Sequence, residues 1–276
     1  MSKNTNEILS LWPKKVAELN ERQLEAREGF MRGWLELLPN KYGVVEKFNQ
    51  GWVAKLPLPT QKIKTLEIGA GLGEHASWED LSNQDYYHLD YRKEFTDLLA
   101  KKFGDSQSIL ADIQEKVDLP AESYDRIVAL HVLEHLPSLV KAVVEIVRLL
   151  KKDGFFDVVI PCEGGLAYGI ARKISAQRYF EKRFKMDYIP IVKTEHVNMG
   201  YEIVRLLELF FNFETSSFFP LKVPVFTMNL CYGMRLRRRS EAELRSTFEE
   251  HPHILERIFE SDLQANPSKE LVDSIL

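Results

Sequence analysis

The chain has 276 residues, enough for one or two domains. Apolar residues make up 45% and charged residues 28%, which is typical of a globular protein and excludes disordered, collagen-like and disulfide-rich classes. Lys and Arg number 37 against 41 Asp and Glu, a net charge of −4, so we expect no nucleic acid partner. The two distant cysteines, Cys162 and Cys231, and the lack of a long apolar stretch predict a cytoplasmic protein without a transmembrane segment.

Helices and strands alternate through the middle of the chain. Residues 1–60 are expected to form a helical cap, in which Asn20 caps a helix that ends at Leu38. Short apolar runs predict strands at 63–68, 86–89, 108–110, 126–130 and 155–160, with helices at 138–150 and 201–210. Two last strands, 213–219 and 225–232, are joined by a link too short for a crossover helix and should be antiparallel.

This order predicts an α/β fold with a doubly wound, mostly parallel, seven-stranded sheet over residues 61–239. An insert at 162–198 follows the fifth strand, and an acidic helical tail occupies 240–276, with a capping box at Ser240 and Glu243.

A glycine-rich loop follows the first predicted strand. Gly69, Gly71 and Gly73 permit a tight turn and the close approach of a ligand to the backbone, and we expect a helix after them. A dinucleotide-binding loop would need a small residue at position 74, where this chain has Glu74. A carboxylate there disfavours a pyrophosphate, and Glu67 inside the strand adds negative charge suited to a cationic ligand.

Two acids end the next two predicted strands. Asp90 follows Gly69 by 21 residues, a position from which a carboxylate can accept hydrogen bonds from both hydroxyls of a ribose. Asp112 ends the third strand and could accept a bond from an adenine amine. A nucleoside without phosphates beside a cation describes S-adenosylmethionine.

The segments 65–73, 88–90, 111–113, 123–136 and 149–154 stand in the order and spacing of one known family. The chain resembles a class I S-adenosylmethionine-dependent methyltransferase, most closely the ubiquinone-biosynthesis-type branch, over residues 62–161. The resemblance implies that Glu67, Gly69 and Gly71 shape the pocket for the methionine end of S-adenosylmethionine and that Asp90 holds its ribose. Asp112 and Ile113 would flank the adenine, and Leu130 and His131 would line the floor near the methyl group. Ala70, Gly73 and Tyr91 are assigned to the same cofactor site.

Histidines follow the fourth predicted strand. His131, Glu134 and His135 match an inverted zinc-peptidase motif, but the strand before them and Pro137 after them argue against the long helix that this motif needs. Some relatives hold a divalent ion near this position, and Glu195 and His196 could complete such a site with Glu134 and His135. Because His131 stands where those relatives have an acid, we expect no metal. His131 and His196 are the candidate catalytic bases, since an oxygen or nitrogen nucleophile has to lose a proton; the alternative for His131 is packing against the cofactor.

The insert carries six basic residues with four aromatic ones: Arg172, Lys173, Arg178, Lys182, Arg183 and Lys185, with Tyr168, Tyr179, Phe180 and Phe184. We interpret it as a mobile lid, hinged at Gly164 and Gly165, that selects a small and anionic methyl acceptor, such as a sugar or a lipid-linked intermediate. A peripheral membrane contact, a subunit contact or a solvated helix face are the alternatives. Methylation of an RNA or protein end, or a non-catalytic cofactor-binding module, are the alternative functions, and the sequence leaves the oligomeric state open.

Overall fold

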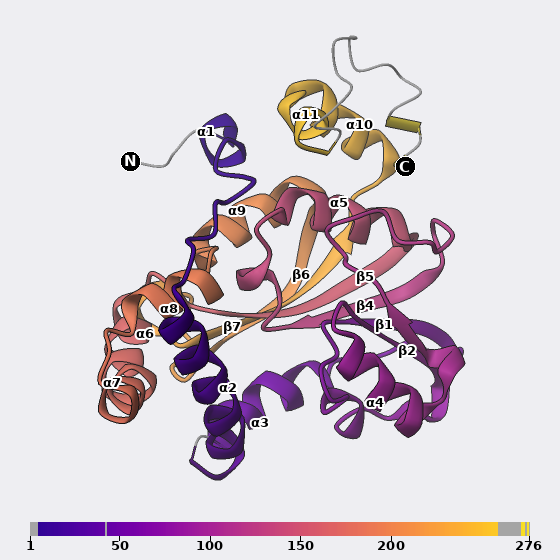
Figure 1. Ribbon diagram of the computed structural model, residues 1–276. Helices are drawn as coiled ribbons and strands as arrows, with labels where there is room; N and C mark the ends of the chain where they lie inside the picture. The colour runs from indigo at the N-terminus through magenta and orange to yellow at the C-terminus, as the bar shows by residue number, and fades with distance from the viewer. Residues whose placement is uncertain (1–4, 42, 259–271, 274, 276) are drawn as a thin grey trace.

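A single seven-stranded sheet forms the centre of the computed structural model, which describes residues 5–41, 43–258, 272–273 and 275 (Figure 1). The strand order is β3-β2-β1-β4-β5-β7-β6, in which the first five strands are parallel and β7 is antiparallel to both of its neighbours. The strands are β1 (Ile63–Ile68), β2 (Gln84–Asp90), β3 (Ser108–Leu110), β4 (Tyr124–Leu130), β5 (Leu150–Pro161), β6 (Phe211–Phe219) and β7 (Cys231–Arg238). The predicted fold class and the antiparallel closing pair are confirmed.

Helices cover both faces of the sheet, as Figure 1 shows. They are α1 (Thr5–Leu9), α2 (Glu21–Lys41), α3 (Gly43–Val53), α4 (Lys93–Phe103), α5 (Leu139–Leu149), α6 (Leu166–Arg172), α7 (Arg178–Phe184), α8 (Ile189–Glu195), α9 (Gly200–Phe210), α10 (Glu241–Glu250) and α11 (His253–Ile258). The main core lies between the sheet and α5 and α9, where apolar residues such as Leu139, Val143 and Ile203 are fully buried. None of the helices in the described residues is both long and apolar enough to cross a membrane.

Three sequence-based predictions about elements were wrong in detail. The glycine loop leads into a short 3-10 turn, His75–Ser77, instead of a helix. That turn is held by side chains: the two ring nitrogens of His75 lie within hydrogen-bond reach of Gln50 and Glu79. The last strand begins at Cys231, six residues later than expected, because Phe226–Met228 forms another 3-10 turn. Helix α2 runs past Pro39 to Lys41, although Asn20 does cap it by accepting a bond from the Gln23 amide at 2.9 Å.

The first 60 residues divide between the two sides of the sheet. Helix α1 packs near α9 and α11, and the buried Trp12 that follows it donates a hydrogen bond from Nε1 to Asn198 Oδ1 at 2.7 Å. Helix α3 instead packs against β5 and β7 on the opposite face. The expected N-terminal cap is therefore two separate coverings joined by α2.

The insert after β5 packs against α2 through a hydrophobic cluster of its own. Phe180 is fully buried and contacts Phe30 with a ring-centroid distance of 5.5 Å, and the Tyr188 ring packs at a tilt against both. Glu195 at the end of α8 also pairs with Arg27 of α2 at 2.5 Å. Tyr179, Phe180 and Phe184 thus pack against α2, whereas Tyr168 packs against the main core. Most of the cations of the insert, such as Lys173 and Lys182, are exposed. The expected hinge is packed as well, since a Cβ at Gly165 would lie 2.9 Å from the carbonyl oxygen of Cys162.

Candidate active site

Four neighbouring parallel strands end at one edge of the sheet, and the loops that leave this edge contain most of the predicted site residues. The order β3-β2-β1-β4 places the loops after β1, β2 and β4 next to one another. Chain connections proceed in opposite directions from β1 and β4, which makes this edge the usual ligand-binding position of an open α/β sheet.

The glycine loop after β1 requires its glycines. Gly69, Gly71 and Gly73 have φ of 66°, 54° and 67°, a conformation that favours glycine. A Cβ at Gly69 would lie 2.5 Å from Val132, and one at Gly73 would lie 2.6 Å from Phe103, so both positions are tightly packed. A Cβ at Gly71 would meet no atom within 4 Å. Gly71 is therefore the glycine of the loop that leaves open space beside the backbone.

The carboxylate of Asp90 is oriented by the backbone on both sides. Asp90 is buried at the end of β2, and its Oδ2 accepts a hydrogen bond from the Gly71 amide at 3.0 Å. Its Oδ1 accepts one from the Arg92 amide at 2.9 Å. Arg92 Nε also donates to Oδ1, at 3.4 Å. Ionised carboxylates have about four acceptor positions, so one is free, and a second opens when the partly exposed Arg92 side chain moves away. The neighbouring Tyr91 is largely exposed, and the buried Ala70 donates its amide to the Leu89 carbonyl at 3.1 Å.

Glu67 is buried in β1 and is engaged by a neighbouring strand. Its Oε2 lies 3.2 Å from His88 Nδ1, and the His88 ring stacks on Phe103 at 4.2 Å. The charge of Glu67 therefore lies in a buried polar pair with His88. Its contribution to a cofactor pocket stays a prediction.

Asp112 and Ile113 lie in the loop after β3. Asp112 is exposed, and its Oδ1 accepts a hydrogen bond from the Gln114 amide at 2.9 Å, which fixes the turn. Ile113 is buried in the main core. The exposed carboxylate remains accessible to a ligand at the edge of the sheet.

The loop after β4 holds an ion pair. Leu130 ends the strand half-buried, and His131 has a left-handed φ of 55°. His131 Nδ1 lies 3.1 Å from Oε1 of the buried Glu134. Burial lowers the pKa of His131, but the neighbouring Cys231 and Glu134 side chains raise it well above its ordinary value. Burial raises the pKa of Glu134, but His131, His135 and His196 lower it to about 2. The ion pair with Glu134 thus favours the protonated form of His131, and its buried Nε2 makes no hydrogen bond to any residue that the structure describes.

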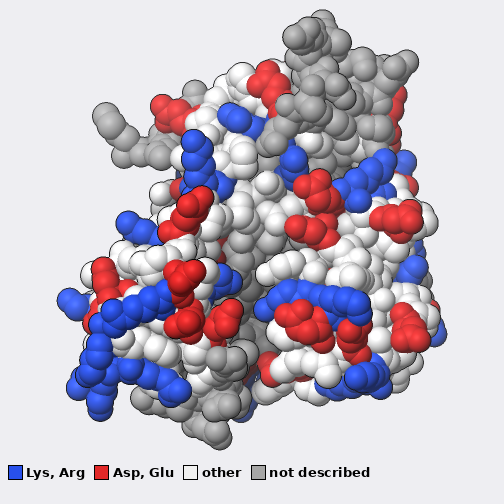
Figure 2. Space-filling model, viewed as in Figure 1, with Lys and Arg blue, Asp and Glu red and all other residues white. Residues whose placement is uncertain are grey.

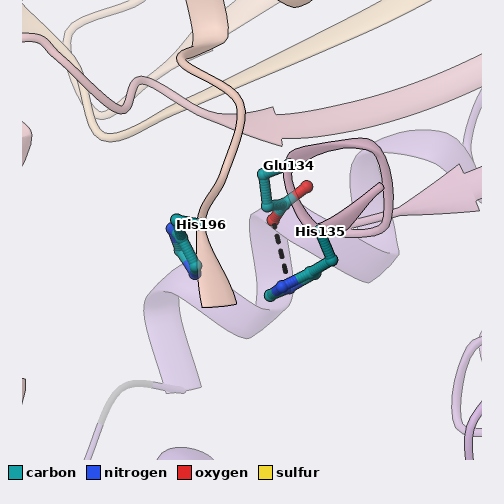
Figure 3. Close-up of side chains that lie close together, drawn as sticks. All are labelled: Glu134, His135 and His196. Atoms are coloured by element: carbon teal, nitrogen blue, oxygen red, sulfur yellow. Dashed lines mark ion pairs between the residues drawn. The ribbon is translucent and has the colours of Figure 1, made fainter. Parts of the chain in front are cut away.

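Two histidines face each other beside this ion pair, one from the loop after β4 and one from the end of the insert (Figure 3). The rings of His135 and His196 are 5.0 Å apart between centroids and nearly perpendicular. His135 Nδ1 donates to the carbonyl of Glu195 at 2.6 Å, and His196 Nδ1 donates to Oε2 of the buried Glu163 at 3.0 Å. Carbonyl and carboxylate oxygens only accept, so these contacts leave a lone pair on each Nε2 when the rings are neutral.

Glu134, His135 and His196 could hold a metal ion, since their ligand atoms all lie within 4.8 Å of one another. Zinc bonds of about 2.1 Å in a tetrahedral site would place ligand atoms roughly 3.4 Å apart. The cluster would have to contract to close around a metal. Glu195, the other residue considered for such a site, has its carboxylate engaged by Arg27.

Two residues that sequence reasoning missed hold these groups in place. Glu163, two residues after β5, pairs with Arg172 as well as with His196. Asn198 is fully buried and donates to the carbonyls of Leu133 and Leu136 at 2.8 and 2.7 Å, which ties the end of the insert to the loop after β4. The only sequence feature that could have indicated Glu163 is its position as an acid just after a buried strand. Asn198 gave none, because its partners lie more than 60 residues away in the chain.

Residues 66–158 match a family model described as a methyltransferase domain. The chain carries a methyltransferase domain. The match covers about a third of the chain, and it includes the glycine loop, Asp90, Asp112 and the loop after β4. It confirms the methyltransferase resemblance found in the sequence.

Solved structures are similar to this chain. One is a 1,6-didemethyltoxoflavin-N1-methyltransferase from Burkholderia thailandensis with bound 1,6-didemethyltoxoflavin and S-adenosylhomocysteine, at 15% identity and a TM-score of 0.51 over 81% of this chain and 93% of that one. Another is a SAM-dependent methyltransferase from Aquifex aeolicus, at 16% identity and a TM-score of 0.48 over 73% and 98% of the two chains. No curated protein sequence matches this methyltransferase.

Proposed function

We propose that the protein transfers the methyl group of S-adenosylmethionine to an oxygen or nitrogen atom of a small anionic acceptor. One observation carries the proposal. The insert brings His196, with its Nδ1 bonded to Glu163, beside the strand edge from which the cofactor loops extend. A basic group next to a methyl donor is what transfer to a protonated nucleophile requires.

The cofactor would lie across the ends of β2, β1 and β4. Asp90 would hold the ribose through its free acceptor position and the one that Arg92 Nε occupies at 3.4 Å, and the open side of Gly71 would let the methionine part approach the backbone. Asp112 and Ile113 would flank the adenine, and Leu130 and His131 would lie near the methyl group. Gly69, Ala70 and Gly73 would act through the shape of the loop.

Methyl transfer is an in-line displacement at carbon, so most of the catalysis comes from alignment of the acceptor with the methyl group. The acceptor proton needs a base. Between the two candidate histidines we favour His196, because its Nε2 carries a lone pair while Glu163 accepts from Nδ1. The ion pair with Glu134 favours the protonated form of His131, whose Nε2–H would instead donate a hydrogen bond to a ligand.

The charge of the insert supports an anionic acceptor such as a sugar phosphate or a lipid-linked intermediate. Arg172 lies at this site, because it pairs with Glu163, the residue that also binds His196. An acceptor carboxylate or phosphate could compete for that guanidinium, which is suited to bidentate contacts.

Titration calorimetry tests the cofactor, and transfer of labelled methyl groups to a panel of phosphorylated sugars and lipid-linked sugars tests the acceptor. We expect His196→Asn to lower kcat by about 10²- to 10⁴-fold, the range for a general base, while cofactor affinity stays the same. Glu163→Gln should lower kcat less, because an amide can still accept from Nδ1. The matched control is His253→Asn, which alters an exposed histidine that pairs with Glu256 on α11. Full activity of His196→Asn would overturn the assignment of the base, and a lack of S-adenosylmethionine binding by the wild type would overturn the proposed function.

A further inference from the structure

One face of the insert exposes aliphatic side chains. Helices α6 and α7 are joined by a π-helical turn, Lys173–Gln177, so residues 166–184 form one continuous helical segment. Leu166, Ile170 and Ile174 follow one another at intervals of four residues and are 72%, 54% and 68% exposed. Residues at this spacing lie on one side of a helix. The opposite side, with Ala176 and Phe180, packs against α2.

Cations continue the same exposed face. Lys173, Arg178 and Lys182 are exposed and make no ion pair with any acid that the structure describes. Together with Ile174, Gln177 and Glu181 they line a shallow hollow of about 490 Å³. The acid in this hollow, Glu181, accepts a hydrogen bond from Gln177 Nε2 at 2.8 Å. Figure 2 shows Lys and Arg side chains gathered at the lower left of the molecule, over α7.

A second segment extends the aliphatic part of this surface. The loop between β6 and β7 contains a 3-10 turn, Phe226–Met228, that packs against α6. Four of its aliphatic residues are between 41% and 52% exposed: Leu221, Val223, Val225 and Met228. We call the exposed side of residues 166–182 and of this loop the docking face.

We propose that the docking face binds the surface of a membrane that contains anionic lipids. Aliphatic side chains can enter the boundary between headgroups and acyl chains, while the flanking cations contact anionic headgroups. The protein as a whole has a net charge of −4, so this basic surface is a local feature.

The chemistry of the docking face favours a lipid over other partners. A symmetric contact with a second copy would bring Lys173, Arg178 and Lys182 against the same cations, which repel one another. Single-stranded nucleic acid is usually held by aromatic residues on which bases stack. Here the aromatic rings of the segment are packed inward: Tyr179, Phe180 and Phe184 belong to the cluster with Phe30 of α2, and Tyr168 packs against the main core. The exposed groups are aliphatic and cationic, which is the composition of an interfacial helix.

Membrane binding would bring the candidate active site close to the lipid surface. The exposed segment begins three residues after Glu163, which binds His196. An acceptor that is attached to a lipid could then reach the site from the bilayer. Vesicle binding is measured without cofactor or acceptor, so the inference stands or fails separately from the proposed function.

The test is sedimentation of the full chain with vesicles of phosphatidylcholine alone and with vesicles that also contain 30% phosphatidylglycerol. We expect binding to the anionic vesicles only. Lys173→Gln with Lys182→Gln should weaken that binding by about 30-fold, since each cation near an anionic surface contributes about fivefold. Ile170→Ser with Ile174→Ser should weaken it at least tenfold, although both side chains are exposed and the fold is not expected to change.

The matched control is Leu98→Ser with Lys101→Gln on α4, an equally exposed pair on another helix, which should bind like the wild type. Circular dichroism and thermal unfolding show that each variant is folded. Equal binding to the two kinds of vesicle, or unchanged binding of both docking-face variants, would overturn the inference. The inference would also be overturned if the wild type is a dimer that the docking-face substitutions dissociate, or if these substitutions weaken binding to a 20-nucleotide RNA and not to vesicles.

Discussion

Replacement of Asp90 by alanine is the most direct test of the cofactor site. The side chain is 1% exposed, and its two oxygens already accept the Gly71 and Arg92 amides at 3.0 and 2.9 Å. The carboxylate is therefore held in one orientation before a ligand arrives. Loss of a charge-assisted, bidentate contact with a ribose costs about 2–3 kcal/mol, which corresponds to a roughly 30- to 150-fold weaker Kd for S-adenosylmethionine.

The same change has a cost in stability that the assay must separate from binding. Asp90→Ala leaves two backbone N–H groups without their acceptor, which should lower the free energy of unfolding by about 1–3 kcal/mol. Binding should therefore be measured by calorimetry well below the melting temperature, after circular dichroism has shown a folded protein. Asp97→Ala removes an exposed partner of Lys93 and serves as the control, with an expected change below about 1 kcal/mol. A folded Asp90→Ala protein that binds S-adenosylmethionine within threefold of the wild type would refute the reasoning.

Three further predictions concern the groups around the loop after β4. Glu134→Gln should destabilise the protein most near pH 6, where Glu134 and His131 are both charged. The lowered pKa of Glu134 gives stability that is present above its ordinary pKa and is lost as the pH falls toward 2. The raised pKa of His131 gives stability that is present below its ordinary pKa and is lost as the pH rises through the raised value. Urea unfolding from pH 4 to 9 measures this difference, and a pH-independent difference would contradict it. Asn198→Ala should lower the free energy of unfolding by about 2–4 kcal/mol, because Trp12 Nε1 and two buried carbonyls lose their partner; a melting temperature unchanged within 1 °C would show that these bonds are not needed. Treatment with a chelator should leave methyl transfer unchanged, because the Glu134, His135 and His196 ligand atoms are spread over as much as 4.8 Å; loss of activity that zinc or magnesium restores would assign this cluster to a metal.

The sequence by itself determined the sheet and its edge. Strands β1 to β5 were predicted because buried parallel strands are short, continuous apolar runs that end at turn residues, a signal that needs no distant partner. The three glycines predicted a loop with left-handed φ, because only glycine adopts that conformation freely. Asp90 and Asp112 followed from where their strands end. These features are local, and adjacent strand ends meet at one edge in any sheet of this topology.

The tertiary structure decided what the side chains do to one another. The sequence showed basic and aromatic residues alternating in the insert, but only the fold reveals that Phe180 packs against Phe30 of α2 and leaves Lys173 and Ile174 exposed. His196 was expected as a catalytic base, with a metal site shared with Glu134 and His135 as the alternative. In the structure it is bonded to Glu163, 33 residues earlier in the chain, and faces His135, which lies 61 positions before it. Contacts over such distances depend on how separate segments pack, and no periodicity or spacing in the sequence records which of several buried polar groups will meet.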